Sequence, residues 1–196
     1  MTITRDAQNV PHYGVFELSL EADAKDRHPI FETEFAVVFT RPDGSTVVAE
    51  GFYDGNRTYT GRAYADALGG WQWRTRSNVA ELNDQSGSFT VVPSNLKGQL
   101  RHHPDDSYQF AYDNGDWFLH IGDTGYRYVT DTEPEWRAYI DQADAAGFTK
   151  IRTWFCRGRS DVQALFNPQR TDLNLPYWQE IDRRMSYALN AHPHIM

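Results

Sequence analysis

The sequence predicts two fold classes in one chain: an immunoglobulin-like β-sandwich over residues 1–98 and an α/β segment over residues 99–196. Up to residue 92, strand-like runs alternate with turn residues at intervals of roughly ten residues, as they do in β-sandwiches. After residue 108, strand-like runs alternate with apolar residues at helical spacing, which indicates βαβ units. The turn-forming residues of 93–98 mark the expected junction.

Six runs rich in β-branched and aromatic residues are expected to form the strands of the sandwich. They are residues 14–20, 34–40, 46–53, 57–64, 70–75 and 87–92. The stretches 42–44, 54–56 and 69–70 lie between some of them and are typical of turns. Trp71 and Trp73 share one face of their strand, and large aromatic residues at this spacing favour core packing over a carbohydrate-binding platform.

The first strand of the α/β segment is expected to follow a hairpin. Residues 108–112 and 117–121 are rich in aromatic and branched side chains, and they flank Asp113-Asn-Gly-Asp116, a stretch typical of a tight turn. The second run should therefore be a strand that ends at residues 122–124.

A helix is expected next. Thr132 and Glu135 fit a capping box, and Pro134 is tolerated in the first helical turn. Gly147 can end the helix in the left-handed conformation. Its apolar face recurs at spacings of three and four residues through Trp136, Tyr139, Ile140, Ala143 and Ala146.

The pattern continues with a second strand at residues 148–155, a second helix at 176–190 and the approach to a third strand at 192–196. Strand, helix and strand at this spacing predict a right-handed parallel crossover. No α/β fold closes with two helices and two and a half strands, so the segment is expected to be incomplete.

Composition restricts the expected partners. A net charge of −8 without a long basic run argues against nucleic acid. The only cysteine, Cys156, excludes an internal disulfide and fits a reducing compartment. No apolar signal segment and no stretch long enough to span a membrane is visible. As written, the chain is expected in the cytoplasm without membrane contact, export remains an open alternative, and the oligomeric state is not set by the sequence.

Metal and cofactor chemistry is not expected. The stretch Arg101-His-His-Pro-Asp-Asp106 contains ligand residue types, but adjacent histidines on extended chain point apart and no matching ligand cluster follows. The sequence has no Gly-rich phosphate loop, Gly-x-Ser-x-Gly elbow or Cys/His nucleophile pattern. Hydrolysis by carboxylates is the chemistry that remains.

Several motifs carry a family resemblance. Residues 50–55, 70–78 and 87–92 resemble the N-terminal β-sandwich domain of unknown function that precedes the barrel in a group of bacterial glycoside hydrolases. Residues 118–124 and 146–152 are similar to the first and second barrel strands of apiosidase-like and related clan A glycosidases. The order of these motifs along nearly the whole chain makes the resemblance more specific than any one of them.

The resemblance implies an incomplete (β/α)8 TIM barrel after the sandwich, with two βα units and the start of strand three. Enzymes of that type take their two catalytic carboxylates from strands four and seven, which would lie beyond Met196. It therefore implies a glycoside hydrolase that cleaves O-glycosidic bonds in poly- or oligosaccharides, with no catalytic residue in this chain and no activity from it alone. The alternatives are a non-catalytic carbohydrate-binding or partner-interaction β-sandwich module and a barrel completed by another chain.

The same resemblance, with the barrel rule for strand ends, predicts substrate-binding residues. Asp123 could accept a hydrogen bond from a sugar hydroxyl or cap its loop. Arg152 could face the barrel mouth or lie outward, and Trp154, on the same face by alternation, could stack on a sugar or pack in the core. Arg157 could contact substrate or be solvated. Tyr126 is a weaker candidate.

Overall fold

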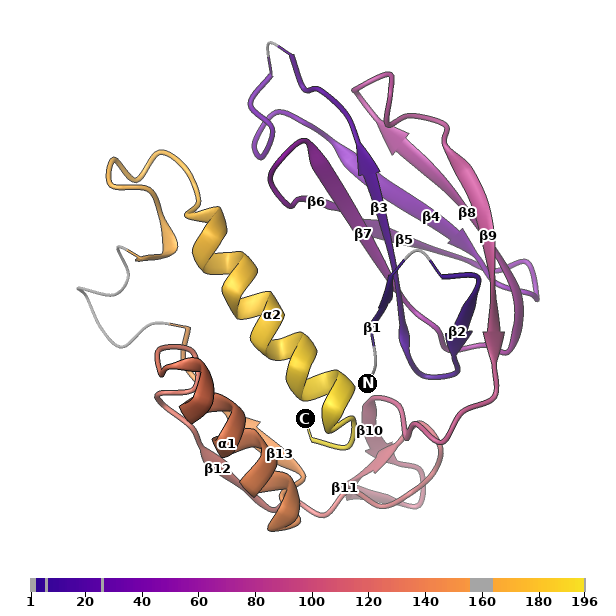
Figure 1. Cartoon of the computed structure of the whole chain (residues 1–196). Helices are drawn as coiled ribbons and strands as arrows, with labels where there is room; N and C mark the ends of the chain where they lie inside the picture. Colours follow the sequence, from indigo (N-terminus) through magenta and orange to yellow (C-terminus); the bar gives the residue numbers. More distant parts are fainter. Residues whose placement is uncertain (1–2, 6, 26, 156–163, 196) are drawn as a thin grey trace. The chain divides into compact units, whose positions relative to one another are not determined.

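The computed structural model describes residues 3–5, 7–25, 27–155 and 164–195. The chain divides into two compact units, Met1–Gly98 and Gln99–Met196 (Figure 1). Each unit has its own core, and each is described by itself.

The first unit consists of two β-sheets. One sheet has the strand order β1 (Ile3–Arg5), β3 (Val15–Glu21), β7 (Thr58–Tyr64) and β6 (Phe52–Tyr53). The other has the order β2 (Asn9–Pro11), β9 (Ser86–Val92), β8 (Gly69–Ser77), β4 (Phe35–Thr40) and β5 (Thr46–Glu50). The β1–β3 and β2–β9 pairs are parallel, and the remaining pairs are antiparallel.

Alternating side chains from both sheets form the core of the first unit. In β4, Phe35, Val37 and Phe39 are buried and the residues between them are not, as expected for strands covered on one face. The Phe16 ring of β3 stacks on the Phe89 ring of β9 with 4.1 Å between centroids, which joins the two sheets. Gly61 permits their close approach, because a Cβ atom there would lie 2.6 Å from Val37 Cγ2.

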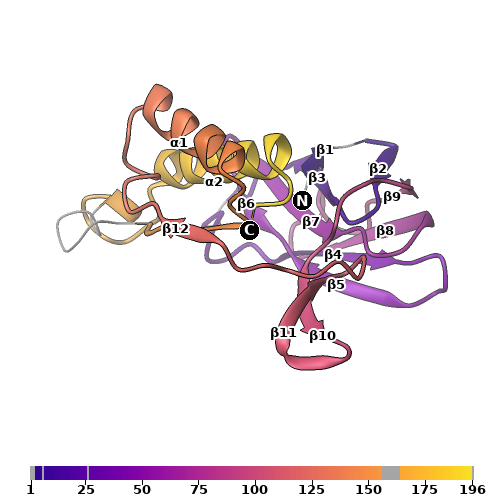
Figure 2. The same cartoon turned by 90° about the horizontal axis from the view of Figure 1, so that it is seen from below.

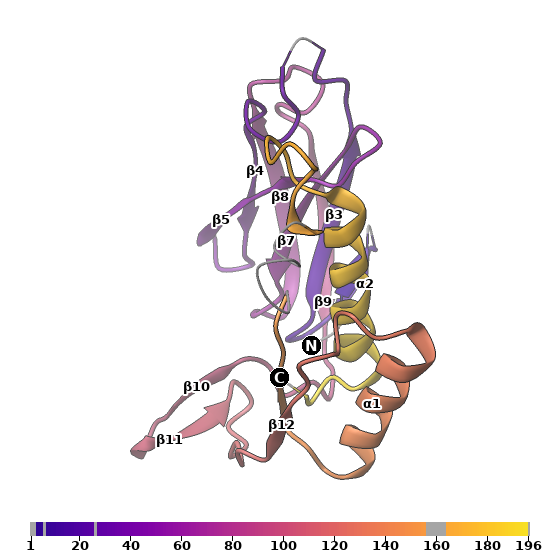
Figure 3. The ribbon, with the colours of Figure 1, turned by 90° about the vertical axis from the view of Figure 1, so that its left-hand side faces the viewer.

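The second unit combines a hairpin, a short parallel sheet and two helices. Its elements are β10 (Leu100–His103), β11 (Asp106–Tyr112), β12 (Gly122–Thr124), α1 (Glu133–Ala145), β13 (Lys150–Arg152) and α2 (Leu175–Ala191). β10 and β11 pair antiparallel, and β12 and β13 pair parallel. Figures 1 and 2 show α1 and α2 side by side, and Figure 3 shows the β10–β11 hairpin apart from them.

Helix α1 forms where its capping residues predict it. The backbone N–H of Thr132 donates to Glu135 Oε2 at 2.9 Å, and Gly147 has a φ of 76° just beyond the helix. Trp136 and Ile140 of α1 are buried against Ile181 of α2 in the core of the unit. The guanidinium of Arg184, another α2 residue, donates to the Tyr128 carbonyl at 2.7 Å in the same region.

The prediction of an incomplete (β/α)8 TIM barrel is wrong. The described residues contain one strand–helix–strand unit, β12-α1-β13, and its parallel sheet has two strands of three residues each. The first barrel strand was expected to begin at residue 117 and end at 122–124, but only Gly122–Thr124 forms a strand, and residues 117–121 contribute one isolated bridge between Ala111 and Trp117. Residues 192–195 form no strand.

Burial gives the physical reason for this difference. A barrel strand is covered on both faces, so its branched and aromatic side chains must be inside. Phe118 is buried and its backbone N–H donates to the Phe110 carbonyl of β11, but Leu119 is 66% exposed and Trp117 and Ile121 are also exposed, so only one side of this run is covered among the described residues. Composition favours a strand at 117–121, but among the described residues the run forms only a single bridge to β11.

Candidate functional site

The carboxyl ends of β12 and β13 meet at one edge of their parallel sheet. Asp123 pairs with Ile151 and Thr124 with Arg152, so the chain leaves both strands at the same level. The Thr153 hydroxyl donates to the Gly125 carbonyl at 2.9 Å and joins the two segments directly after the strands. This strand-end edge holds most of the residues that the sequence predicted for substrate binding.

Two exposed aromatic rings stand at the strand-end edge. Tyr126 follows β12 and Trp154 follows β13, and their rings make an edge-to-face pair with 4.7 Å between centroids. Tyr126 is 49% exposed and Trp154 43% exposed, although both are large apolar side chains. The geometry stabilises the pair while leaving ring surface open to a ligand.

Asp123 is held by a tyrosine from α1. The Tyr139 hydroxyl donates to Asp123 Oδ2 at 3.3 Å. Burial, followed by the negative charge of Asp123, raises the pKa of Tyr139 to about 12, so the phenol keeps its proton at neutral pH. Gly125 makes room for the ring, because a Cβ there would lie 2.6 Å from Tyr139 Cε1. Tyr139 thus positions one oxygen of an exposed carboxylate.

Arg152 lies on the opposite face of the sheet from Asp123. Ile151 pairs with Asp123 and packs against the core of the unit, and successive strand residues point to opposite faces. The Arg152 side chain is exposed and makes no hydrogen bond or ion pair with a described residue. The structure therefore brings Trp154 to Tyr126 and Asp123 to Tyr139, and it does not join Asp123 to Arg152.

Two further placements complete the comparison with the sequence. Arg157 lies outside the described residues. Tyr139 was expected only as a helix residue of the apolar face, and its contact with Asp123 was missed. The signal available in the sequence was a tyrosine on the apolar face of the predicted helix, which follows the strand that ends near Asp123. The contact itself is seen only in the structure.

The histidine pair of β10 has structural contacts. His103 is buried with its ring 4.0 Å from that of Trp117, whereas His102 is exposed and stacks on Phe110 at 5.5 Å. Over the ranges that the structure describes, no three His, Cys, Asp or Glu side chains gather as a metal-binding group. Within the same ranges, neither helix combines the length and apolar character needed to cross a membrane.

Comparisons with known proteins find one family match and a longer structural relative. Residues 9–78 match a family described as a domain of unknown function (DUF5060). No curated protein matches the chain significantly. The chain is similar to the crystal structure of a "putative glycoside hydrolase" from Bacteroides vulgatus ATCC 8482, with 22% identity and a TM-score of 0.79. The match covers 93% of this chain and 39% of that one, so this chain spans well under half of that protein's length.

A second solved structure, the Lin-41 filamin domain, matches 43% of this chain and 83% of its own, with 13% identity and a TM-score of 0.34. At that TM-score the similarity carries no argument. At 22% identity, the similarity to the Bacteroides vulgatus protein establishes a shared fold along nearly all of this chain.

Proposed function

We propose that this chain is part of a glycoside hydrolase and contacts saccharide at the strand-end edge of β12 and β13. The observation that carries the proposal is the exposed Tyr126–Trp154 pair, which stands at the same strand-end edge as the carboxylate of Asp123. The fold shared with the Bacteroides vulgatus protein supports it. Within this proposal, the resemblance of the sequence motifs favours an enzyme of the apiosidase-like type.

The side chains at the edge suit a sugar. The apolar face of a pyranose or furanose ring packs on an aromatic plane, which Trp154 offers to solvent. The Asp123 oxygen that does not receive the Tyr139 hydroxyl can accept a hydrogen bond from a sugar hydroxyl. Arg152, unpaired among the described residues, can donate to a hydroxyl or ring oxygen on the other side of the sheet. Arg157 is proposed as a further contact.

Cleavage of a glycosidic bond needs a protonated acid at the leaving oxygen and a second carboxylate for the anomeric carbon or its attacking water. Of these groups, the edge supplies one carboxylate from the described residues, Asp123. A second one would have to come from elsewhere in the protein. The proposed role of the edge is therefore to hold substrate, and we expect no hydrolysis by this chain alone.

The test measures binding of neutral oligosaccharides to the whole chain by tryptophan fluorescence and calorimetry. The variant is Trp154→Ala, and the control is Trp117→Ala, because Trp117 is another exposed tryptophan of the same unit. Loss of about 50 Å² of apolar contact at about 25 cal/mol per Å² costs about 1.3 kcal/mol, so Trp154→Ala should weaken binding nearly tenfold. Equal effects of the two substitutions would contradict the proposed site.

A further inference from the structure

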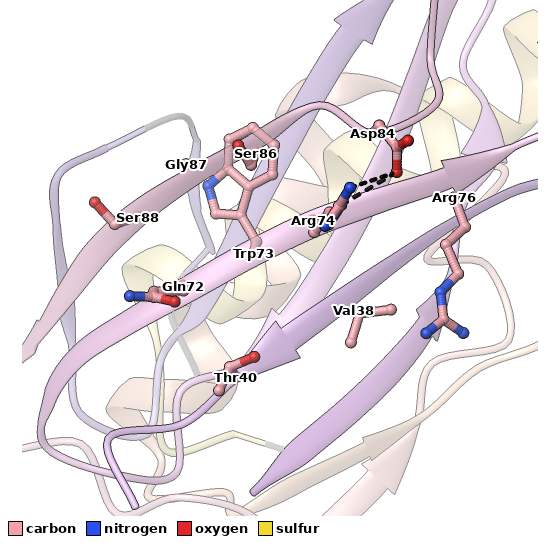
Figure 4. Close-up of a pocket in the computed structure, with 10 residues that line it drawn as sticks. All are labelled: Val38, Thr40, Gln72, Trp73, Arg74, Arg76, Asp84, Ser86, Gly87 and Ser88. Atoms are coloured by element: carbon pink, nitrogen blue, oxygen red, sulfur yellow. Dashed lines mark hydrogen bonds and ion pairs between the residues drawn. The ribbon is translucent and has the colours of Figure 1, made fainter. Parts of the chain in front are cut away.

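The outer face of the five-stranded sheet in the first unit carries an open groove of about 720 Å³ (Figure 4). Trp71 and Thr75 of β8 point into the core, so the alternate residues Gln72, Arg74 and Arg76 point outward. Figure 4 shows these three side chains following one another along β8. The neighbouring strands add Val38, Thr40, Ser86 and Ser88 to its lining, and Asp84 also lines it.

Strand register arranges the lining in rows across the sheet. Gln72 lies opposite Thr40 on β4 and opposite Ser88 on β9. Arg74 lies opposite Val38 and Ser86 on the same two strands. Neighbouring strands are about 4.8 Å apart and alternate residues about 7 Å apart, so the groove offers polar groups at regular intervals in two directions.

Most of these polar groups have no partner among the residues that the structure describes. The side chains of Thr40, Gln72, Arg76, Ser86 and Ser88 form no hydrogen bond or ion pair with any residue that the structure describes. Arg74 pairs with Asp84 at 3.1 Å, with 67% and 62% of the two side chains exposed. An exposed ion pair of this kind stabilises a protein by at most about 1 kcal/mol, so a ligand can replace Asp84 at little cost.

The charge of the groove opposes that of the chain. Two guanidinium groups and one carboxylate line it, whereas the whole chain has a net charge of −8. A guanidinium presents two parallel N–H donors that match a carboxylate, and an amide and three hydroxyls flank the arginines. Val38, which lies opposite Arg74 on β4, adds a small apolar surface to the groove. The net charge disfavours nucleic acid as the occupant, because phosphate recognition requires a broadly basic surface.

We propose that this groove binds a carboxylated oligosaccharide, with a uronate carboxylate on Arg76 and Arg74 and sugar hydroxyls on Gln72, Thr40 and Ser88. The anionic part of this proposal rests on the groove itself, and the choice of a saccharide rests on the proposed function. The groove shares no residue with the strand-end edge of the second unit, so the two sites can be tested with different substitutions.

The experiment titrates the whole chain with trigalacturonate and, as the matched neutral probe, with its fully methyl-esterified form. The variants are Arg76→Ala and Arg74→Ala. Arg27→Ala is the control, because Arg27 is an exposed arginine in the loop between β3 and β4, outside the lining. Thermal unfolding by circular dichroism verifies that each variant is folded.

We expect trigalacturonate to bind with a Kd of about 1 mM or below, and Arg76→Ala to weaken it about tenfold, as should esterification. Arg27→Ala should leave this affinity unchanged. Equal binding of acid and ester, equal effects of the Arg76 and Arg27 substitutions, equal competition by inorganic sulfate, or no binding of trigalacturonate would each overturn the proposal. Neutral oligosaccharide binding that depends on Trp154 would still support the strand-end site in each of those cases.

Discussion

Gly125→Ala tests whether Tyr139 holds Asp123 as the structure shows. Gly125 follows β12, and the ring of Tyr139 lies against its Cα on the side where a side chain would project. An added Cβ would be 2.6 Å from Cε1 and 2.8 Å from both Cζ and Oη of Tyr139. The substitution therefore acts on this one contact without changing any charge.

The magnitude follows from these distances. Ordinary van der Waals contact for a Cβ begins near 3.4 Å, so the ring must move by roughly 0.8 Å to relieve the overlap. The hydrogen bond from Tyr139 to Asp123 already measures 3.3 Å and would be broken by that movement. Overpacking costs about 1–3 kcal/mol and the lost hydrogen bond about 1 kcal/mol, so we expect the free energy of unfolding to fall by roughly 2–4 kcal/mol.

Tyrosine titration reports the contact directly. Burial is the first cause that raises the pKa of Tyr139 to about 12, and the neighbouring Asp123 adds to it through its charge and hydrogen bond. The raised pKa means that its contribution to stability is fully present below pH 10, the ordinary value, and is lost as pH rises towards 12. In Gly125→Ala, tyrosinate absorbance should show Tyr139 titrating closer to pH 10. The chain has eleven tyrosines, so the part of the absorbance change that is lost in Tyr139→Phe identifies the contribution of Tyr139.

Gly70→Ala is the matched control, because nothing lies within 4 Å of a Cβ at Gly70. It should leave both the titration curve and the urea midpoint close to those of the parent chain. If Gly125→Ala behaved like Gly70→Ala in both measurements, Tyr139 would not lie against Gly125, and the argument that it positions Asp123 would fail.

Two further predictions concern the cores and pH. Trp71→Ala should lower the free energy of unfolding, measured in urea, by about 3–5 kcal/mol, because Trp71 is fully buried. Trp154→Ala should change the same quantity by less than about 1 kcal/mol, because Trp154 is exposed. Similar values for the two substitutions would contradict the assignment of Trp71 to the core. A hydrogen bond from His192 is the first cause that lowers the pKa of Asp141 below 3.8, so its contribution to stability is present above pH 3.8 and is lost as pH falls further. Asp141→Asn should therefore destabilise the chain at pH 7 and have little effect at pH 2.5, as measured by urea unfolding at both pH values.

Local signals predicted many individual elements from the sequence. The expected runs 34–40 and 57–64 contain β4 and β7, and the expected helix 176–190 matches α2. These elements follow from side-chain periodicity and backbone caps, which act over a few residues. They need no knowledge of which segment becomes the neighbour.

The barrel prediction failed where a neighbour was needed. Trp117, Leu119 and Ile121 alternate like strand residues, and only burial distinguishes a covered strand from an exposed extended segment. The expected second strand at 148–155 also shortens to β13, three residues long, because only Lys150–Arg152 find partners on β12. β-propensity describes what fits a sheet, and pairing decides where the sheet is.

The candidate sites depend on register in the same way. Alternation within one strand placed Gln72, Arg74 and Arg76 on a common face, but their polar surroundings arise only when β4 and β9 bring Thr40 and Ser88 to either side. Register has the opposite effect at the strand-end edge: because Asp123 pairs with Ile151, Arg152 is turned to the far face of the sheet. A shift of one residue would reverse both outcomes, so each site is a property of strand pairing as much as of residue type.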